Sequence, residues 1–124
     1  MISAMCLALN IYFEARNQPL VGQILVAQVT MNRVESDSYP DTICKVVWQK
    51  RQFSWTHDGK SDTPKNKPVF DGIYKLSELL LRHPEIFVDE SVTHYHADTV
   101  EPYWAKDFTF LYKYGDHLFY ADDP

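Results

Sequence analysis

The sequence predicts an α+β domain that is mainly helical and ends in a small β element. Two observations carry this prediction. The first two thirds of the chain hold apolar segments with helical spacing, and the last third holds short runs rich in aromatic and β-branched residues. Helices followed by strands are typical of the α+β class. A length of 124 residues suits one domain, so we expect residues 1–124 to fold as a single domain.

The first two helices are expected over residues 3–15 and 20–34. Pro19 separates them, because a proline disfavours helical geometry in the residue before it. Ser3 is the expected N-cap of the first helix. The second helix is apolar around most of its circumference, which is typical of a helix at the centre of a core.

A short helix is expected over residues 43–48, capped by Asp41 or Thr42. The segment 49–67 that follows mixes Lys, Asp, Pro and Gly with aromatic residues. It is longer than the usual connection of about 4–6 residues, and loops of that length tend to be functional or mobile. We therefore expect an ordered functional loop or a flap here.

A third long helix is expected over residues 72–82, with Asp71 as its cap and Pro84 after its end. Its inward positions should be Ile73, Leu76, Leu79 and Leu80. The strands should follow within residues 91–97, 108–115 and 117–122, with turns at Asp98 and at Gly115-Asp116.

The charge balance excludes one large class of partner. The chain has 12 Lys and Arg against 17 Asp and Glu, a net charge of −5, and it has no basic stripe. Affinity for nucleic acid comes mainly from Lys and Arg at the phosphates, so nucleic acid is not expected as a partner. No apolar run approaches the roughly 20 residues that cross a bilayer, and the first residues do not have the pattern of a secretory signal.

The two cysteines, Cys6 and Cys44, allow two interpretations. They are either buried free thiols or one disulfide that ties the first helix to the segment after the second. A disulfide closing a loop of this size would add roughly 3–4 kcal/mol in an oxidising compartment. Sequence alone does not give the distance between them, so both interpretations stay open.

Glu14 is the strongest candidate for a catalytic residue. It lies near the end of an apolar helix, next to Tyr12 and Phe13. A carboxyl group among aromatic rings is desolvated, which raises its pKa and suits a general acid. The alternative is an ordinary exposed glutamate that pairs with Arg16 or Arg33.

A set of short motifs in the same order resembles the SleB-type cell wall hydrolases, the family named for the spore cortex-lytic enzymes. The motifs run through nearly the whole chain: Tyr12 to Arg16, Gly22-Gln23, Asn32-Arg33-Val34, Tyr39-Pro40, Val46-Val47, Gln52-Phe53-Ser54, His94-Tyr95-His96-Ala97, Pro102-x-Trp104-Ala105, and Gly115-x-His117 with Phe119-Tyr120. No single motif is specific, but the ordered set is.

The resemblance implies a lysozyme-like fold that acts on the glycan strands of bacterial peptidoglycan, without a cofactor. It places the essential acid of the family on Glu14. Members of the family are lytic transglycosylases or muramidase- and glucosaminidase-like enzymes that cleave beside N-acetylmuramic acid. A transglycosylase needs one acid, which later acts as a base. A hydrolase needs a second carboxylate, about 5 Å away as a nucleophile or about 6.5–9.5 Å away to position water.

The sequence departs from many relatives just after Glu14, where Asn17, Gln18 and Val21 stand in place of glycine and acidic residues. No second carboxylate is evident in this turn, which favours a lytic transglycosylase that forms 1,6-anhydro-muramic ends. Asp58 and Asp62 in the long loop are the alternatives for a hydrolase, although aspartates beside glycine are more often turn formers.

Six further residues are candidate substrate contacts. Amide, hydroxyl and imidazole groups could bind sugar substituents, and aromatic rings could stack on sugars. The candidates are Gln23, Asn32, Ser54, Trp55, Tyr95 and His96. Helix capping is the alternative for Asn32 and Arg33. Phe53 and Trp104 could also stack on sugar rings, but core packing is favoured for both. His117 is expected to be a buried histidine with its hydrogen bonds satisfied.

Two rival functions remain. His94 and His96 would point the same way on a strand and could begin the zinc site of an amidase, but no third ligand completes the spacing, so no metal site is expected. A non-catalytic wall-binding module is the second rival, and an intact Glu14 argues against it. We expect a monomer that acts on the cell wall. If it is a bacteriophage endolysin, it would stay in the cytoplasm until release.

Overall fold

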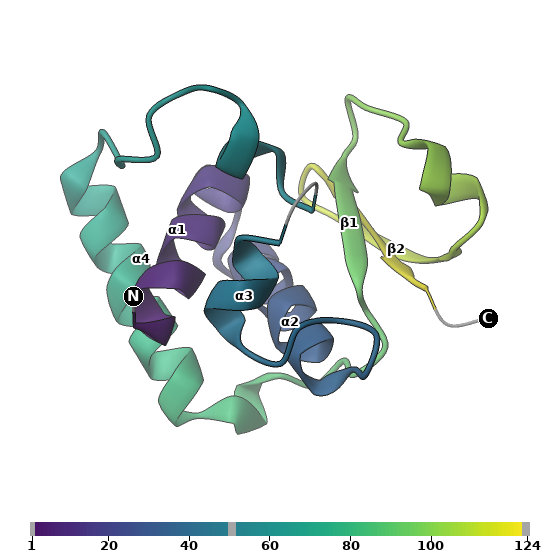
Figure 1. Ribbon diagram of the computed structural model, residues 1–124, viewed down its shortest axis with the longest axis horizontal. Coiled ribbons are helices and arrows are strands. Elements are labelled where there is room, and N and C mark those ends of the chain that lie inside the picture. Colours follow the sequence, from purple (N-terminus) through teal and green to yellow (C-terminus); the bar gives the residue numbers. More distant parts are fainter. Residues whose placement is uncertain (1, 50–51, 123–124) are drawn as a thin grey trace.

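The computed structural model describes residues 2–49 and 52–122. It has two parts that lie side by side, a helical lobe built from the first two thirds of the chain and a small sheet built from the last third (Figure 1). This arrangement confirms the predicted mainly helical α+β class.

Helices α1 and α2 follow the predicted boundaries closely. The helices are α1 (Ser3–Ala15), α2 (Leu20–Glu35), α3 (Ile43–Val47) and α4 (Lys67–Arg82), and the 3-10 helices are η1 (Ser54–His57), η2 (Pro84–Ile86) and η3 (Tyr103–Lys106). The sequence predicted α1 and α2 well because their apolar residues repeat with helical spacing and Pro19 separates them.

The predicted N-caps of α1 and α4 are wrong, and α4 also begins earlier than predicted. Ser3 is the first helical residue of α1, and Ile2 occupies the N-cap position. Helix α4 begins at Lys67 rather than after Asp71, because the Asn66 side chain accepts a 3.2 Å hydrogen bond from the Val69 N–H group. Pro68 fits in this first turn, since an N–H group there would have no partner within the helix.

The predicted cap of α3 is confirmed, and the predicted inward positions of α4 are confirmed in part. The Thr42 side chain caps α3 by accepting a 3.2 Å hydrogen bond from the Lys45 N–H group, as one of the two predicted caps. Within α4, Ile73 and Leu80 are buried as predicted, but Leu79 is 42% exposed. Leu76 is partly buried and packs against the core, as do Phe70, Tyr74 and Leu81, which the prediction did not include.

Helix α1 runs through the middle of the helical lobe, between α4 and the α2–α3 pair (Figure 1). Most of its side chains are buried, which the aromatic and aliphatic sequence of this segment explains. Cys6 of α1 and Cys44 of α3 form a disulfide, with their Cα atoms 5.3 Å apart. The structure therefore supports the disulfide interpretation rather than two free thiols.

The sheet has three antiparallel strands in the order β1-β3-β2. They are β1 (His94–Ala97), β2 (Thr109–Tyr114) and β3 (His117–Ala121). Strands β2 and β3 form a hairpin through Gly115, whose positive φ of 57° suits glycine. The buried residues Val29, Val92 and Phe119 join the sheet to α2.

No helix in the described part of the chain is long and apolar enough to cross a membrane.

Candidate active site

A groove of about 560 Å³ is lined by residues of both the helical lobe and the sheet. The helical side supplies the end of α1, part of α2 and the start of η1, and the other side supplies β1, the segment after it and the start of β3. The lining residues are Glu14, Arg33, Gln52, Phe53, Ser54, His94, Tyr95, His96, Ala97, Val100, Pro102, Tyr103, Trp104, Phe108 and His117. Both aromatic and polar side chains therefore face one concave surface.

Glu14 is the only carboxylate among the described residues that line this groove. It lies one residue before the end of α1, where its side chain is partly buried. Burial raises the pKa of Glu14 from 4.5 to about 7, and the positive charge of Arg33 opposes the shift. Near neutral pH this carboxyl group can therefore both donate and accept a proton.

Arg33 places a buried positive charge in the same groove. Its Nε atom donates a 2.8 Å hydrogen bond to the Thr93 carbonyl, and its Nη1 atom donates one of 3.2 Å to Gln52 Oε1. Its guanidinium also lies over the rings of Tyr39 and Phe53, at 5.1 and 5.2 Å. These contacts hold the Arg33 guanidinium in place, and its positive charge favours the carboxylate form of Glu14.

Two histidines of β1 lie against Trp104. The ring centroids of His94 and His96 are 5.0 and 5.7 Å from that of Trp104. Burial lowers the pKa of His94 to about 4, so this imidazole is neutral at pH 7. Both nitrogens of His96 have partners: Nδ1 lies 2.7 Å from the Ala97 carbonyl and Nε2 lies 3.0 Å from the Tyr120 hydroxyl.

Tyr95 points to the opposite face of β1 and packs on Phe53, with the ring centroids 6.1 Å apart. Burial raises the pKa of the Tyr95 hydroxyl well above its usual value, and the negative charge of Glu14 adds to the shift. This hydroxyl therefore stays protonated and lies within the electrostatic reach of the acid.

His117 differs from its prediction. It is buried as expected, but its Nδ1 atom has no hydrogen-bond partner among the residues that the structure describes. Burial lowers the pKa of His117, which favours the neutral imidazole. A neutral ring with an open nitrogen in the groove can donate or accept a hydrogen bond, depending on its tautomer.

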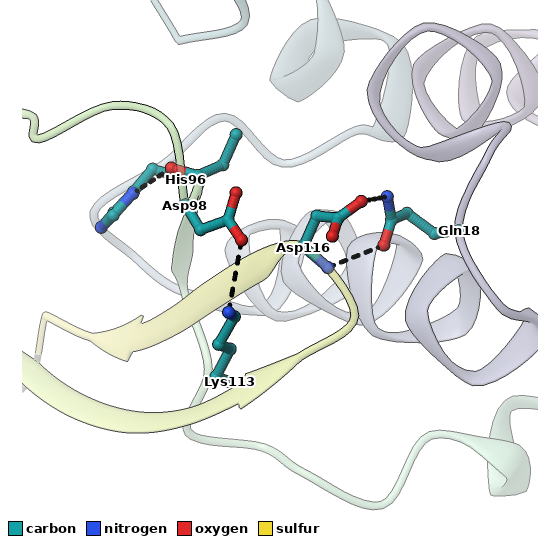
Figure 2. A network of polar contacts seen from close by, with 6 residues as sticks. Gln18, His96, Asp98, Lys113 and Asp116 are labelled. Carbon is teal, nitrogen blue, oxygen red and sulfur yellow. Dashed lines mark hydrogen bonds and ion pairs between the residues drawn. The ribbon is translucent and has the colours of Figure 1, made fainter.

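Gln18, in the turn after Glu14, forms two hydrogen bonds with the β2–β3 hairpin (Figure 2). Gln18 Nε2 donates a 2.9 Å hydrogen bond to Asp116 Oδ2, and Gln18 Oε1 accepts one of 2.9 Å from the Asp116 N–H group. A Cβ atom at Gly115 would displace the Gln18 amide from its position, and the positive φ there favours glycine. The Asp116 carbonyl in turn accepts a 2.8 Å bond from the Asp98 N–H group. Gln18 and Asp116 thus join the turn after α1 to the β2–β3 hairpin.

The structure places three of the predicted substrate contacts in the groove, namely Ser54, Tyr95 and His96. The other three lie outside it. Gln23 Nε2 donates to the Ala15 carbonyl at 3.2 Å and so holds the turn after Glu14. Asn32 Nδ2 donates to the carbonyls of Asp89 and Val92, at 2.8 and 2.6 Å.

Trp55 is buried rather than presented to a ligand. Its ring stacks on Phe13 with the centroids 4.9 Å apart, and its Nε1 atom donates a 2.9 Å hydrogen bond to Asn10 Oδ1. The Trp55 ring therefore packs beneath the acid-bearing end of α1. Trp55 also lines a second hollow, together with Asp58 and Asp62.

The candidate second carboxylates do not share the groove with Glu14, whereas the candidate metal ligands His94 and His96 do. Asp58 and Asp62 line the second hollow and not the groove. Within the described ranges, no group of three or more His, Cys, Asp or Glu side chains could hold a metal ion. The imidazoles of His94 and His96 are instead engaged in the aromatic cluster around Trp104.

Three residues that line the groove were not proposed as substrate-binding or catalytic residues from the sequence. Arg33 entered as part of a motif, as a helix cap or as the partner of an exposed Glu14, His94 entered in a motif or as a metal ligand, and Tyr103 did not enter at all. The signal for Arg33 was its place on an otherwise apolar helix, since a lone charge there requires a buried partner or a site. No comparable signal marked Tyr103.

The chain belongs to the cell wall hydrolase family, whose pattern matches residues 17–120. The match begins just after Glu14. The mainly helical fold with its small sheet is shared with two solved structures. One is the catalytic domain of the germination-specific lytic transglycosylase SleB from Bacillus anthracis, with a TM-score of 0.72, 26% identity, and coverage of 95% of this chain and 93% of that one. The other is the catalytic domain of the Bacillus cereus SleB protein, with a TM-score of 0.66, 25% identity, and coverage of 95% and 89%.

Curated relatives carry the same similarity. A spore cortex-lytic enzyme of Bacillus cereus is 30% identical over 114 residues, which are 88% of this chain and 40% of that protein. One of Bacillus subtilis is 26% identical over 113 residues, which are 91% of this chain and 35% of that protein. The chain thus spans about two fifths of the length of these relatives. These findings confirm the predicted SleB-type family and its lysozyme-like fold.

Proposed function

We propose that this chain cleaves the glycan strand of bacterial peptidoglycan beside N-acetylmuramic acid, with Glu14 as general acid and then general base. The observation that carries the proposal is one carboxyl group, without a second among the described residues of the groove, whose pKa is raised by burial to about 7. A carboxyl group with that pKa has both protonation states available near neutral pH, as a group that donates and later accepts a proton requires.

The reaction needs two proton transfers at one residue. Protonated Glu14 gives its proton to the glycosidic oxygen, the bond from that oxygen to C1 of muramic acid breaks, and positive charge develops at the ring. The Glu14 carboxylate then removes the proton from the 6-hydroxyl of the same sugar while O6 bonds to C1. The product is a 1,6-anhydro ring, no water is consumed, and Glu14 ends protonated.

A lytic transglycosylase is favoured over a hydrolase because the groove holds no second carboxylate among the described residues. The 6-hydroxyl belongs to the reacting sugar, so it attacks at a high effective concentration without a second activated group. The name of the SleB catalytic domain from Bacillus anthracis, a lytic transglycosylase, supports the same choice. A muramidase or glucosaminidase with Asp58 or Asp62 as second carboxylate is the alternative.

The groove also suggests roles for the other predicted residues. Ser54, Tyr95 and His96 would bind the substrate, since they line the groove beside Glu14. Gln23, Asn32 and Trp55 would support these groups from outside it, because they hold the turn, the segment before β1 and the end of α1. Arg33 would stabilise the carboxylate form of Glu14 between the two proton transfers.

We further propose that residues 1–124 form a single catalytic domain, monomeric and without a bound cofactor, that acts on the cell wall. An endolysin released from the cytoplasm fits this role. Both parts of the fold contribute to one groove, which is the reason to treat them as a single unit.

The test is Glu14→Gln, which keeps the size of the side chain and removes the proton donor. Lysis of permeabilised bacteria should fall by about 10²–10⁴-fold, the usual contribution of general acid catalysis. Glu78→Gln, on the exposed side of α4, is the matched control and should retain activity. Substantial lysis by a folded Glu14→Gln variant would overturn the assignment.

A further inference from the structure

Tyr103 is the most exposed aromatic residue that lines the groove. It is 84% exposed and lies at the start of η3, within the segment that arches away from β1 before β2 begins (Figure 1). Val100, which is 53% exposed, and Pro102 line the same part of the groove. Together these three residues form an apolar surface that solvent reaches at the groove, and such a surface is typical of a ligand-binding site.

The ring is carried by a firmly held segment. The next residue, Trp104, stacks on Phe108 with the centroids 5.5 Å apart and meets Tyr120 edge-on at 5.3 Å. The hydrogen bond from the Asp98 N–H group to the Asp116 carbonyl holds the base of the segment, and a 3.3 Å ion pair joins Asp98 to Lys113 (Figure 2). Because its support is already ordered, Tyr103 can stack on a ligand at little cost in backbone entropy.

We propose that Tyr103, with Val100 and Pro102, is a subsite that stacks on one pyranose ring of the glycan strand. This inference rests on the proposed function, which places a glycan in the groove. A pyranose presents a face of C–H groups and a rim of hydroxyl groups. The apolar face suits the tyrosine ring and its aliphatic neighbours, and the polar rim suits Gln52 and Ser54 in the same groove.

The subsite binds the sugar rather than the stem peptide. The residues that form it are uncharged, whereas stem peptides carry carboxylates and amines that call for charged partners. Of the aromatic rings that the sequence suggested for stacking, Phe53 and Trp55 are buried, and Tyr95 and Trp104 line the groove but are only partly exposed. Tyr103 therefore supplies the open aromatic surface that they cannot.

Binding is measured with peptide-free glycan strands, released from peptidoglycan by an amidase, and with Glu14→Gln as the parent so that nothing is cleaved. Tyr103→Ala in this parent should weaken binding about 2- to 10-fold, the usual range for one aromatic contact. Tyr103→Phe keeps the ring and should bind as the parent does. Phe110→Ala is the matched control, because Phe110 is a 52% exposed aromatic residue of the sheet that does not line the groove.

The outcomes separate the two proposals. If the parent binds glycan strands and Tyr103→Ala binds them equally well, the subsite is wrong while the proposed function stands. If Tyr103→Ala and Phe110→Ala weaken binding equally, the effect is a general loosening of the sheet, and the subsite is also wrong. If the folded parent binds no glycan at all, the proposed function itself fails.

Discussion

Replacing Glu14 by Gln should change how the stability of the folded protein depends on pH, and this change can be measured without any substrate. The pKa of Glu14 is raised from 4.5 to about 7 by folding. The folded protein therefore holds this proton more tightly than the unfolded chain does. The stability that follows is fully present below pH 4.5 and is lost as the pH rises through about 7.

The size of the loss follows from the two pKa values. Each pH unit between them is worth about 1.4 kcal/mol, which gives about 3 kcal/mol for a fully buried carboxyl group. Glu14 keeps some exposure to solvent, so we expect about 2 kcal/mol. The free energy of unfolding of the wild type should fall by this amount, relative to Glu14→Gln, between pH 4.5 and pH 8.

The assay is urea denaturation of both proteins at several pH values in that window. His94 and His117, whose pKa values are lowered by burial, contribute to the pH dependence of both proteins. Subtracting the stability curve of the variant from that of the wild type removes their contribution. Glu78→Gln should show no such difference from the wild type. Two parallel stability curves for wild type and Glu14→Gln would refute the raised pKa, and with it the reason for assigning Glu14 as the acid.

Three further predictions concern the disulfide, the turn and the rate. Reduction of Cys6–Cys44, which lie 38 residues apart, should remove about 3–4 kcal/mol and lower the melting temperature by about 10–15 °C in calorimetry; an unchanged curve would contradict this. Gln18→Ala removes both hydrogen bonds to Asp116, so the protein should melt about 4 °C lower and lyse cells more slowly; full activity would show that the link does not matter. The lytic rate should decline above about pH 7, as Glu14 loses its proton, and a flat rate profile to pH 9 would argue against it.

The helices and strands could be predicted because their signals are local. Apolar spacing, Pro19 and the aromatic runs lie within each element, and tertiary contacts did not override them. The start of α4 was wrong for a local reason as well. Asn66 and Asp71 are both acceptable caps, and Asn66 prevails because Pro68 can occupy the first turn.

The groove could be predicted only in part, because it joins residues far apart in the sequence. Glu14 was found because its aromatic neighbours lie beside it in the chain. The link between Gln18 and Asp116 spans 98 residues, and no periodicity reveals it. The exposure of Tyr103 depends on how Trp104 packs into the aromatic cluster, which the spacing of residues alone does not encode.

The most direct test of the account is mass spectrometry of the muropeptides released from peptidoglycan digested in water enriched in oxygen-18. Because Glu14 is the single carboxylate among the described groove residues, the account predicts products that end in 1,6-anhydro-muramic acid and carry no label at the new ends. Such products are one water lighter than their hydrolysed counterparts. Reducing ends that carry oxygen-18 would contradict it, because water would then be the attacking group and a second activating residue would be needed.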